Sequence, residues 1–146
     1  MITPGRVILN LRVRDKGALL DELARRVDAP GLAPDAIAAA LKGREELGST
    51  GLGRGFALPH ARLPDLRIFI GLLARLARPI DYAAIDGEPV DLVFLLLIPQ
   101  QESTVPESAA VSTLAAIARR FRDEDTLAKV RAAATAAEIH SLMTAA

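Results

Sequence analysis

Residues 90–98 read Val-Asp-Leu-Val-Phe-Leu-Leu-Leu-Ile, and Pro99 ends the run. This is the most hydrophobic of the strands that the sequence predicts, and it is far shorter than the ~20 residues that a helix needs to cross a bilayer. A second apolar run, residues 68–76, also has the length of a strand. Apolar runs of this length without alternation are typical of strands that are buried on both faces of a sheet. A sheet of this kind needs helices on both sides.

Helical patterns lie on both sides of these strands in the sequence. A strand at residues 7–13 comes first, and helices follow at about 16–27, with Asp15 as cap, and at about 34–47. Strands follow at 56–58, 68–76 and 90–98, and then helices at 107–121, after Asp123 and at 135–143. The order strand, two helices, three strands, three helices predicts an α/β fold. We expect a three-layer α/β/α sandwich with a mixed sheet, formed by residues 1–146 as a single domain.

The composition narrows the classes of function. Hydrophobic residues make up 51% of the chain, and 18 basic residues balance 18 acidic ones. A nucleic-acid-binding protein normally carries a basic excess or stripe, so we expect no nucleic-acid partner. The sequence contains no cysteine, which excludes disulfides and cysteine-based metal sites. The start of the chain does not resemble a signal peptide, and we expect a cytoplasmic protein without direct membrane insertion.

A glycine-rich stretch covers residues 48–55, Gly-Ser-Thr-Gly-Leu-Gly-Arg-Gly. As a P-loop it lacks the lysine, which Arg54 replaces, and the hydroxyl residue, which Gly55 replaces. The spacing of its glycines also differs from the dinucleotide-binding fingerprint. His60 and His140 are the only histidines, and neither lies in a carboxylate cluster with metal-ligand spacing. We therefore expect no bound nucleotide, metal or other cofactor.

His60 follows the glycine-rich stretch directly, behind Pro59. A neutral imidazole is a nucleophile near pH 7, and a phosphoryl group on it needs N–H donors and a nearby cation. The glycines offer N–H groups, Ser49 and Thr50 offer hydroxyls, and Arg44 or Arg62 offers positive charge. On the residues alone, a packing or surface histidine beside an ordinary turn is the commoner arrangement and stays open as an interpretation.

Two blocks of the sequence resemble a known family. Residues 44–62, Arg-Glu-Glu-Leu-Gly-Ser-Thr-Gly-Leu-Gly-Arg-Gly-Phe-Ala-Leu-Pro-His-Ala-Arg, look like the signature of the enzyme IIA of the bacterial sugar phosphotransferase system, of the fructose, mannitol and nitrogen-regulatory type. Residues 79–94, from Pro79 to Phe94, resemble a second block of the same family, in the correct order and spacing. The similarity extends more loosely from about Val7 to Met143.

The resemblance implies a phosphohistidine carrier. His60 would accept a phosphoryl group from the phosphohistidine of the small histidine phosphocarrier protein, in a nitrogen or metabolic regulatory role. Arg44 would pair with the phosphoryl oxygens, because its planar fork binds two oxygens at once. Ser49, Thr50 and Gly51 are predicted to bind the phosphoryl group as well. An enzyme IIB or a regulatory target protein would be the next partner.

The sequence departs from the family at one position. Members usually carry a second active-site histidine at the start of the helix after the apolar strand, and Ala110 stands there. His140 is expected to be an ordinary residue of the last helix. Without the second histidine, His60 lacks an orienting hydrogen bond, which affects the rate of phosphoryl transfer. The missing histidine keeps one alternative open, a binding module of the same fold in which His60 is not phosphorylated. A sugar-specific enzyme IIA of the fructose type is the other alternative.

Overall fold

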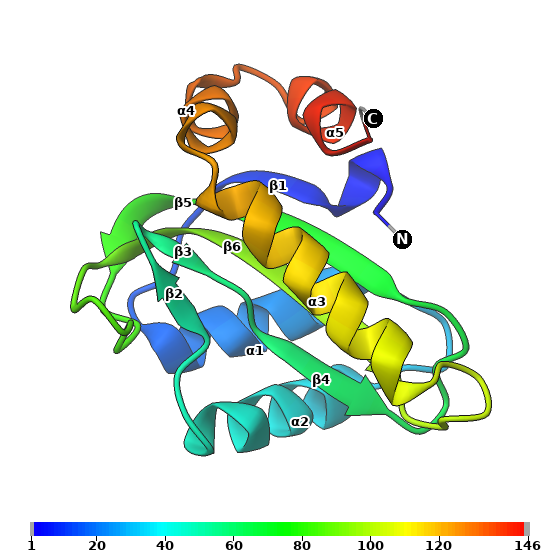
Figure 1. The fold of residues 1–146 in the computed structure, drawn as a ribbon. Coiled ribbons are helices and arrows are strands. Elements are labelled where there is room, and N and C mark those ends of the chain that lie inside the picture. Colours follow the sequence, from blue (N-terminus) through cyan, green and yellow to red (C-terminus); the bar gives the residue numbers. More distant parts are fainter. Residues whose placement is uncertain (1, 145–146) are drawn as a thin grey trace.

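The computed structural model describes residues 2–144 and shows one mixed sheet with helices against both of its faces (Figure 1). The predicted α/β/α sandwich is confirmed. The chain runs in the order η1 (Pro4–Arg6), β1 (Val7–Leu11), α1 (Lys16–Val27), α2 (Pro34–Glu46), β2 (Gly51–Gly53), β3 (Phe56–Ala57), β4 (His60–Leu63), β5 (Ile70–Ile80), β6 (Val90–Pro99), α3 (Glu107–Arg122), α4 (Glu124–Ala132) and α5 (Ala136–Thr144).

The sheet has the strand order β1-β5-β6-β3-β2, and β4 pairs with β6 as well. β5 and β6 are antiparallel, whereas β1 is parallel to β5, and both β3 and β4 are parallel to β6. β6 is therefore the central strand, with neighbours along both edges. Helices cover both faces of this strand, which explains the apolar run from Leu92 to Pro99, because neither face meets water.

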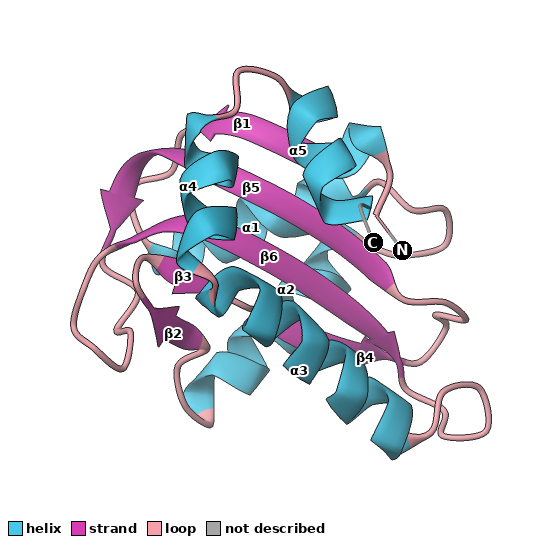
Figure 2. Ribbon diagram, turned by 45° about the horizontal axis from the view of Figure 1, so that its top comes forward, coloured by secondary structure: helices cyan, strands magenta, loops and turns pink. Residues whose placement is uncertain are grey.

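Alternate residues of β6 face two separate hydrophobic cores. Val93, Leu95 and Leu97 pack in the core that α1 and α2 cover, and Leu92, Phe94, Leu96 and Ile98 pack in the core that α3, α4 and α5 cover. Figure 2 shows the two groups of helices on opposite sides of the sheet. The alternation follows from the two-residue period of a strand. One strand thus ties both helical layers to the sheet.

The edge of β6 that carries His60 is lined by two short strands instead of one. Phe56 and Ala57 of β3 pair with Leu92 and Val93, and β4 resumes the parallel pairing with His60 opposite Leu96. Proline has no N–H to give to a ladder, so Pro59 breaks the strand. Its carbonyl still accepts from the Leu96 N–H, at 3.0 Å. The register with β6 is the same on both sides of the break, so His60 pairs with Leu96.

The structure adds two strands, β2 and β4, to the three that the sequence predicts between α2 and α3. β2 reads Gly-Leu-Gly and β4 reads His-Ala-Arg-Leu, and neither carries the β-branched or aromatic residues that are typical of strands. Asp15 and Asp123 cap α1 and α4, as the sequence predicts. Asp15 accepts from the Ala18 N–H at 2.8 Å, and Asp123 accepts from the Thr126 N–H at 3.1 Å.

The Phe121 ring anchors α3 over the part of the sheet that leads to His60. It is buried, stacks on Phe56 with 4.5 Å between ring centroids, and meets the Phe94 ring at a tilt. We expect Phe121→Ala to lower the free energy of unfolding by ~3–5 kcal/mol, because it leaves a cavity between helix and sheet. Urea unfolding followed by circular dichroism measures this change.

Val111→Ala on the same helix is the matched control, because the Val111 side chain is 55% exposed. We expect the control to change the free energy of unfolding by about 0.5 kcal/mol or less. Equal losses in the two variants would contradict the anchoring role of Phe121.

Candidate functional site

The His60 side chain lines a cavity between α2 and α3. The cavity has a volume of about 350 Å³, and its lining includes Arg44, Leu47, His60, Arg62, Glu107 and Ala110. His60 is the first residue of β4, and its side chain is half-buried. The sheet therefore positions the imidazole at the base of an open hollow, where a second protein can reach it.

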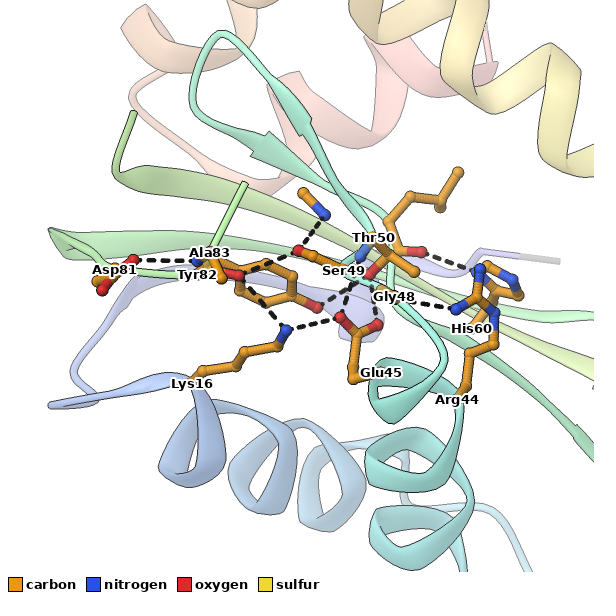
Figure 3. A network of polar contacts seen from close by, with 12 residues as sticks. Lys16, Arg44, Glu45, Gly48, Ser49, Thr50, His60, Asp81, Tyr82 and Ala83 are labelled. Atoms are coloured by element: carbon orange, nitrogen blue, oxygen red, sulfur yellow. Dashed lines mark hydrogen bonds and ion pairs between the residues drawn. The ribbon is translucent and has the colours of Figure 1, made fainter. Parts of the chain in front are cut away.

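The Leu58 carbonyl determines which nitrogen of the His60 ring carries the proton. Nδ1 of His60 lies 2.9 Å from the Leu58 oxygen (Figure 3). A carbonyl oxygen only accepts hydrogen bonds, so Nδ1 must be the N–H group of the neutral ring. The lone pair is then on Nε2, which is the nucleophilic atom of this tautomer.

The surroundings keep the ring neutral. Burial lowers the pKa of His60 below its ordinary value of 6.5, and the positive charge of Arg44 lowers the pKa further. The hydrogen bond to Leu58 and the negative charge of Glu45 act in the opposite direction. The net effect is a lowered pKa, so the nucleophilic form of His60 prevails at pH 7.

Arg44 comes to His60 from a different layer of the fold. It lies in the last turn of α2, and its guanidinium Nη1 donates to the Gly48 carbonyl at 3.0 Å. Figure 3 shows the side chain extending from α2 to the His60 ring, and both residues line the cavity. The structure thus brings the predicted nucleophile and the predicted cation together, although the whole glycine-rich stretch separates them in sequence.

The hydroxyls of Ser49 and Thr50 are not brought into this cavity. Ser49 Oγ donates to the Tyr82 carbonyl at 3.1 Å, and Thr50 Oγ1 donates to the Glu45 carboxylate at 2.5 Å. Thr50 is buried. The predicted direct contact of these hydroxyls with a phosphoryl group therefore lacks support in the structure, because both hydroxyls are already hydrogen-bonded beside Tyr82.

Gly51 has a steric role. Its N–H donates to Ser49 Oγ at 3.1 Å, and its carbonyl accepts from the Ile85 N–H at 3.2 Å. A Cβ at this position would lie 2.8 Å from the Cα and Cβ atoms of Ala84, closer than such atoms approach. Glycine is needed here because β2 runs against the chain at Ala84, and the Gly51 N–H does not face His60.

Lys16, Glu45, Thr50 and Tyr82 form a largely buried polar cluster (Figure 3), of which the sequence analysis singled out only Thr50. The Glu45 side chain is 6% exposed and forms an ion pair of 2.9 Å with Lys16. Burial raises the pKa of the Tyr82 phenol, so the phenol keeps its proton. Since Thr50 gives its single hydroxyl proton to Glu45, the Tyr82 hydroxyl donates to Thr50 Oγ1, at 3.1 Å.

The cluster is connected to the His60 ring through the backbone. The Thr50 N–H donates to Glu45 at 3.0 Å, and the Thr50 carbonyl accepts from the Leu58 N–H at 2.9 Å. The Leu58 carbonyl in turn holds Nδ1 of His60. Two signals in the sequence pointed to the cluster: Glu45 is adjacent to Arg44, and Tyr82 is the only tyrosine of the chain.

A second histidine does not reach the cavity. Ala110 lines it, and the Ala110 side chain is a buried methyl group. His140 lies on α5, and its Nε2 is 3.4 Å from the Ile2 carbonyl at the other end of the chain. Among residues 2–144, His60 is therefore the one imidazole of this site.

A larger hollow of about 690 Å³ lies elsewhere, beside β1 and α1, with Arg12, Arg14, Arg25 and Arg78 in its lining. It contains no histidine or hydroxyl side chain, so it lacks the kind of side chain that makes the His60 cavity the candidate site. Across the described residues, no three His, Cys, Asp or Glu side chains gather as a metal site would require. Within the same part of the chain, no helix combines the length and apolar character needed to cross a membrane.

Comparisons with known proteins agree on one family. Residues 1–146 match the family described as "Phosphoenolpyruvate-dependent sugar phosphotransferase system, EIIA 2". A nitrogen regulatory protein of Bradyrhizobium diazoefficiens is 41% identical over 144 residues, which cover 98% of this chain and 92% of that protein.

Two solved structures share the fold. The nitrogen regulatory protein IIA-Ntr from Neisseria meningitidis has a TM-score of 0.90 and 28% identity, with 98% of this chain and 96% of that chain covered. Enzyme IIA mannitol of Escherichia coli, solved in complex with phosphorylated enzyme IIB mannitol, has a TM-score of 0.76 and 13% identity, with 98% of each chain covered. The second likeness is one of fold alone. Because the family match spans the whole length, and a relative at 41% identity aligns over nearly all of it, the chain belongs to the EIIA 2 family of the phosphoenolpyruvate-dependent sugar phosphotransferase system.

Proposed function

We propose that the chain carries a phosphoryl group on Nε2 of His60 and receives it from the phosphohistidine of the small histidine phosphocarrier protein. One observation carries the proposal: the Leu58 carbonyl holds Nδ1–H of His60 and leaves the Nε2 lone pair free in an open cavity. Membership of the EIIA 2 family supports the same chemistry. A carrier supplied from phosphoenolpyruvate would work in the cytoplasm, where that metabolite is formed.

The transfer balances without a net gain or loss of protons. Nε2 of His60 forms a bond to phosphorus as the bond between phosphorus and the donor imidazole nitrogen breaks, and each ring keeps its other N–H. The His60 ring becomes positively charged when it is phosphorylated. The Leu58 carbonyl at 2.9 Å stabilises this charge, because its oxygen accepts from the more acidic Nδ1–H.

Arg44 is proposed to stabilise the phosphoryl oxygens. Charge on these oxygens builds up during transfer and is best met by a preorganised cation. The bond of Arg44 Nη1 to the Gly48 carbonyl uses one donor of the guanidinium. Four other N–H donors remain for other acceptors.

For Ser49, Thr50 and Gly51 we propose a positioning role in place of a direct contact. Their hydrogen bonds join Glu45 and Tyr82 to Leu58, the residue that orients His60. Loss of these bonds would let the Leu58 carbonyl move. The proton on Nδ1 would then lose the partner that fixes it.

A regulatory role is favoured over delivery of one sugar, because two relatives that align over 98% of this chain and 92% of their own length are named nitrogen regulatory proteins. The next partner would be a regulatory target or an enzyme IIB, the partner in the complex with the mannitol protein. Leu47, at the edge of the cavity, is 84% exposed and suits contact with a protein partner. Ala110 supports one alternative, a binding module in which His60 stays unphosphorylated.

The first prediction concerns the phosphoryl acceptor. We expect an acid-labile mass increase of one phosphoryl group after incubation with phosphoenolpyruvate and the two general phosphotransferase proteins. His60→Gln abolishes the increase because it removes the nucleophile, and His140→Gln is the matched control that retains it. Intact-mass spectrometry measures the change. Full phosphorylation of the His60→Gln variant would refute the assignment, and no phosphorylation of the wild type would favour the binding module.

The second prediction concerns Arg44. We expect Arg44→Gln to slow phosphorylation of His60 by ~10- to 100-fold, because one charge-assisted contact to the phosphoryl oxygens is lost. Rapid-quench measurement of the phosphorylated fraction gives the rate. Arg12→Gln, an exposed arginine in the other hollow, should leave the rate unchanged, and equal slowing by both variants would contradict the assignment.

The third prediction concerns pH. Because the pKa of His60 lies below 6.5, the neutral ring persists below that pH, and the rate of phosphorylation should fall only as the pH drops through the lowered pKa. Arg44→Gln removes a positive charge and should raise the pKa. Titration of the ring by nuclear magnetic resonance checks both statements, and a wild-type pKa above 6.5 would overturn them.

A further inference from the structure

Arg62 and Glu107 form an ion pair on the wall of the cavity that holds His60. Arg62 follows His60 by two residues on β4, and residues two apart on a strand point to the same face. Its Nη1 donates to the Pro99 carbonyl at 2.7 Å, and its Nη2 donates to the Glu107 carboxylate. A second guanidinium therefore lies on the same side of the sheet as the imidazole.

The opposite wall of the cavity belongs to the start of α3, which lies beside the end of β4 (Figure 1). Glu107 is the first residue of α3, and Ala110 follows three residues later. The Ala110 methyl group has no hydrogen-bond donor or positive charge with which to bind an anion. Among the described residues that line the cavity, Arg44 and Arg62 are the arginines and Glu107 is the one carboxylate.

We propose that Arg62 is a second phosphoryl-binding residue, and that Glu107 is its resting counter-ion, which the phosphoryl group of phosphorylated His60 replaces. The proposal rests on the proposed function of His60. No covalent bond changes in this exchange: the Arg62 guanidinium turns from the carboxylate oxygens to the phosphoryl oxygens, and Glu107 moves into water.

The exposure of the two side chains suits such an exchange. The Glu107 side chain is 64% exposed and the Arg62 side chain 26% exposed, so the carboxylate sits on the solvent side of the pair. An ion pair open to water contributes little stability, and parting it costs little. A phosphoryl group carries more negative charge than a carboxylate and has three acceptor oxygens. It therefore competes well for the guanidinium and repels Glu107.

The proposal predicts effects of opposite sign from the two partners of one ion pair. Arg62→Gln removes a cation from the phosphorylated state and should disfavour it. Glu107→Gln removes the competing anion and should favour the phosphorylated state. If the pair merely held β4 to α3, both substitutions would break the same contact and would act in the same direction.

The test is the equilibrium constant for phosphoryl transfer from the phosphorylated histidine phosphocarrier protein to each variant of the full chain, measured by intact mass. We expect Arg62→Gln to lower the constant about 10-fold and Glu107→Gln to raise it about 3-fold. Arg62→Lys keeps the positive charge but lacks the planar guanidinium, so its equilibrium constant should lie between those of Arg62→Gln and the wild type. A decrease for Glu107→Gln, or no change for Arg62→Gln, would overturn the proposal.

Glu124→Gln is the matched control. Glu124 is the first residue of α4, as Glu107 is of α3, and it pairs with Arg54 at 3.6 Å. It does not line the His60 cavity. The control variant should leave the equilibrium constant unchanged, and a rise equal to that of Glu107→Gln would show a general effect of net charge and refute the specific one. Thermal unfolding of every variant checks that the fold is retained.

A second measurement keeps this proposal separate from the proposed function. Inorganic phosphate is titrated into each unphosphorylated variant, and its affinity is read from the His60 ring signals by nuclear magnetic resonance. We expect weaker binding in Arg62→Gln and tighter binding in Glu107→Gln. If the donor does not phosphorylate the wild type, the proposed function fails. The phosphate titration still tests whether Arg62 binds an anion, because an unchanged phosphate affinity in Arg62→Gln would refute that role.

Discussion

The whole structure depends on the burial of β6 on both faces and its pairing along both edges. Since a central strand cannot bond to water, β5 on one side and β3 with β4 on the other must satisfy its backbone. This requirement fixes where β4 begins, and so places His60 opposite Leu96. The position of His60, the proposed nucleophile, thus follows from the packing of the core, and residues from both helical layers line its cavity.

The orientation of His60 depends on a relay of polar contacts that crosses from α2 to the sheet. Glu45 binds Thr50, Thr50 binds Leu58 through the backbone, and Leu58 holds the ring nitrogen. Each group in the relay has a partner, and the structure leaves no buried side-chain polar atom without one among the described residues. Satisfied buried networks of this kind specify one geometry, because any departure leaves a costly unpaired group.

Ala110 determines what α3 contributes to the cavity. The cavity wall that α3 supplies contains a methyl group at the position where the resemblance to the family predicted a second imidazole, and the charges on that side come from Glu107 and Arg62. An ion pair and an imidazole differ in their chemistry. The imidazole titrates near neutral pH and can both donate and accept, whereas a guanidinium stays charged and only donates. A site with this composition suits electrostatic control of the phosphoryl group that we propose it binds.

The sequence by itself determined the layers of the fold and singled out His60 as the candidate nucleophile. Apolar periodicity located the helices, apolar runs located the two long strands, and Asp15 and Asp123 marked helix starts, because these signals act within a few residues of the chain. The motif around His60 was recognisable for the same reason. Even so, β2 and β4 escaped prediction, since strands of three and four residues exist only through pairing with their neighbours.

The tertiary structure alone decided which side chains meet. Ser49 and Thr50 were expected at the phosphoryl group, yet their hydroxyls point to Tyr82 and Glu45, because the partner of a hydroxyl depends on what the fold places within about 3 Å of it. Arg44 and His60 come from different elements and meet only when α2 packs beside β4. The tautomer of His60 depends on the Leu58 carbonyl, and Leu58 is held by a hydrogen bond from its N–H to the Thr50 carbonyl. Contacts between distant segments carry no local signal in a single sequence, and the packed fold supplies them.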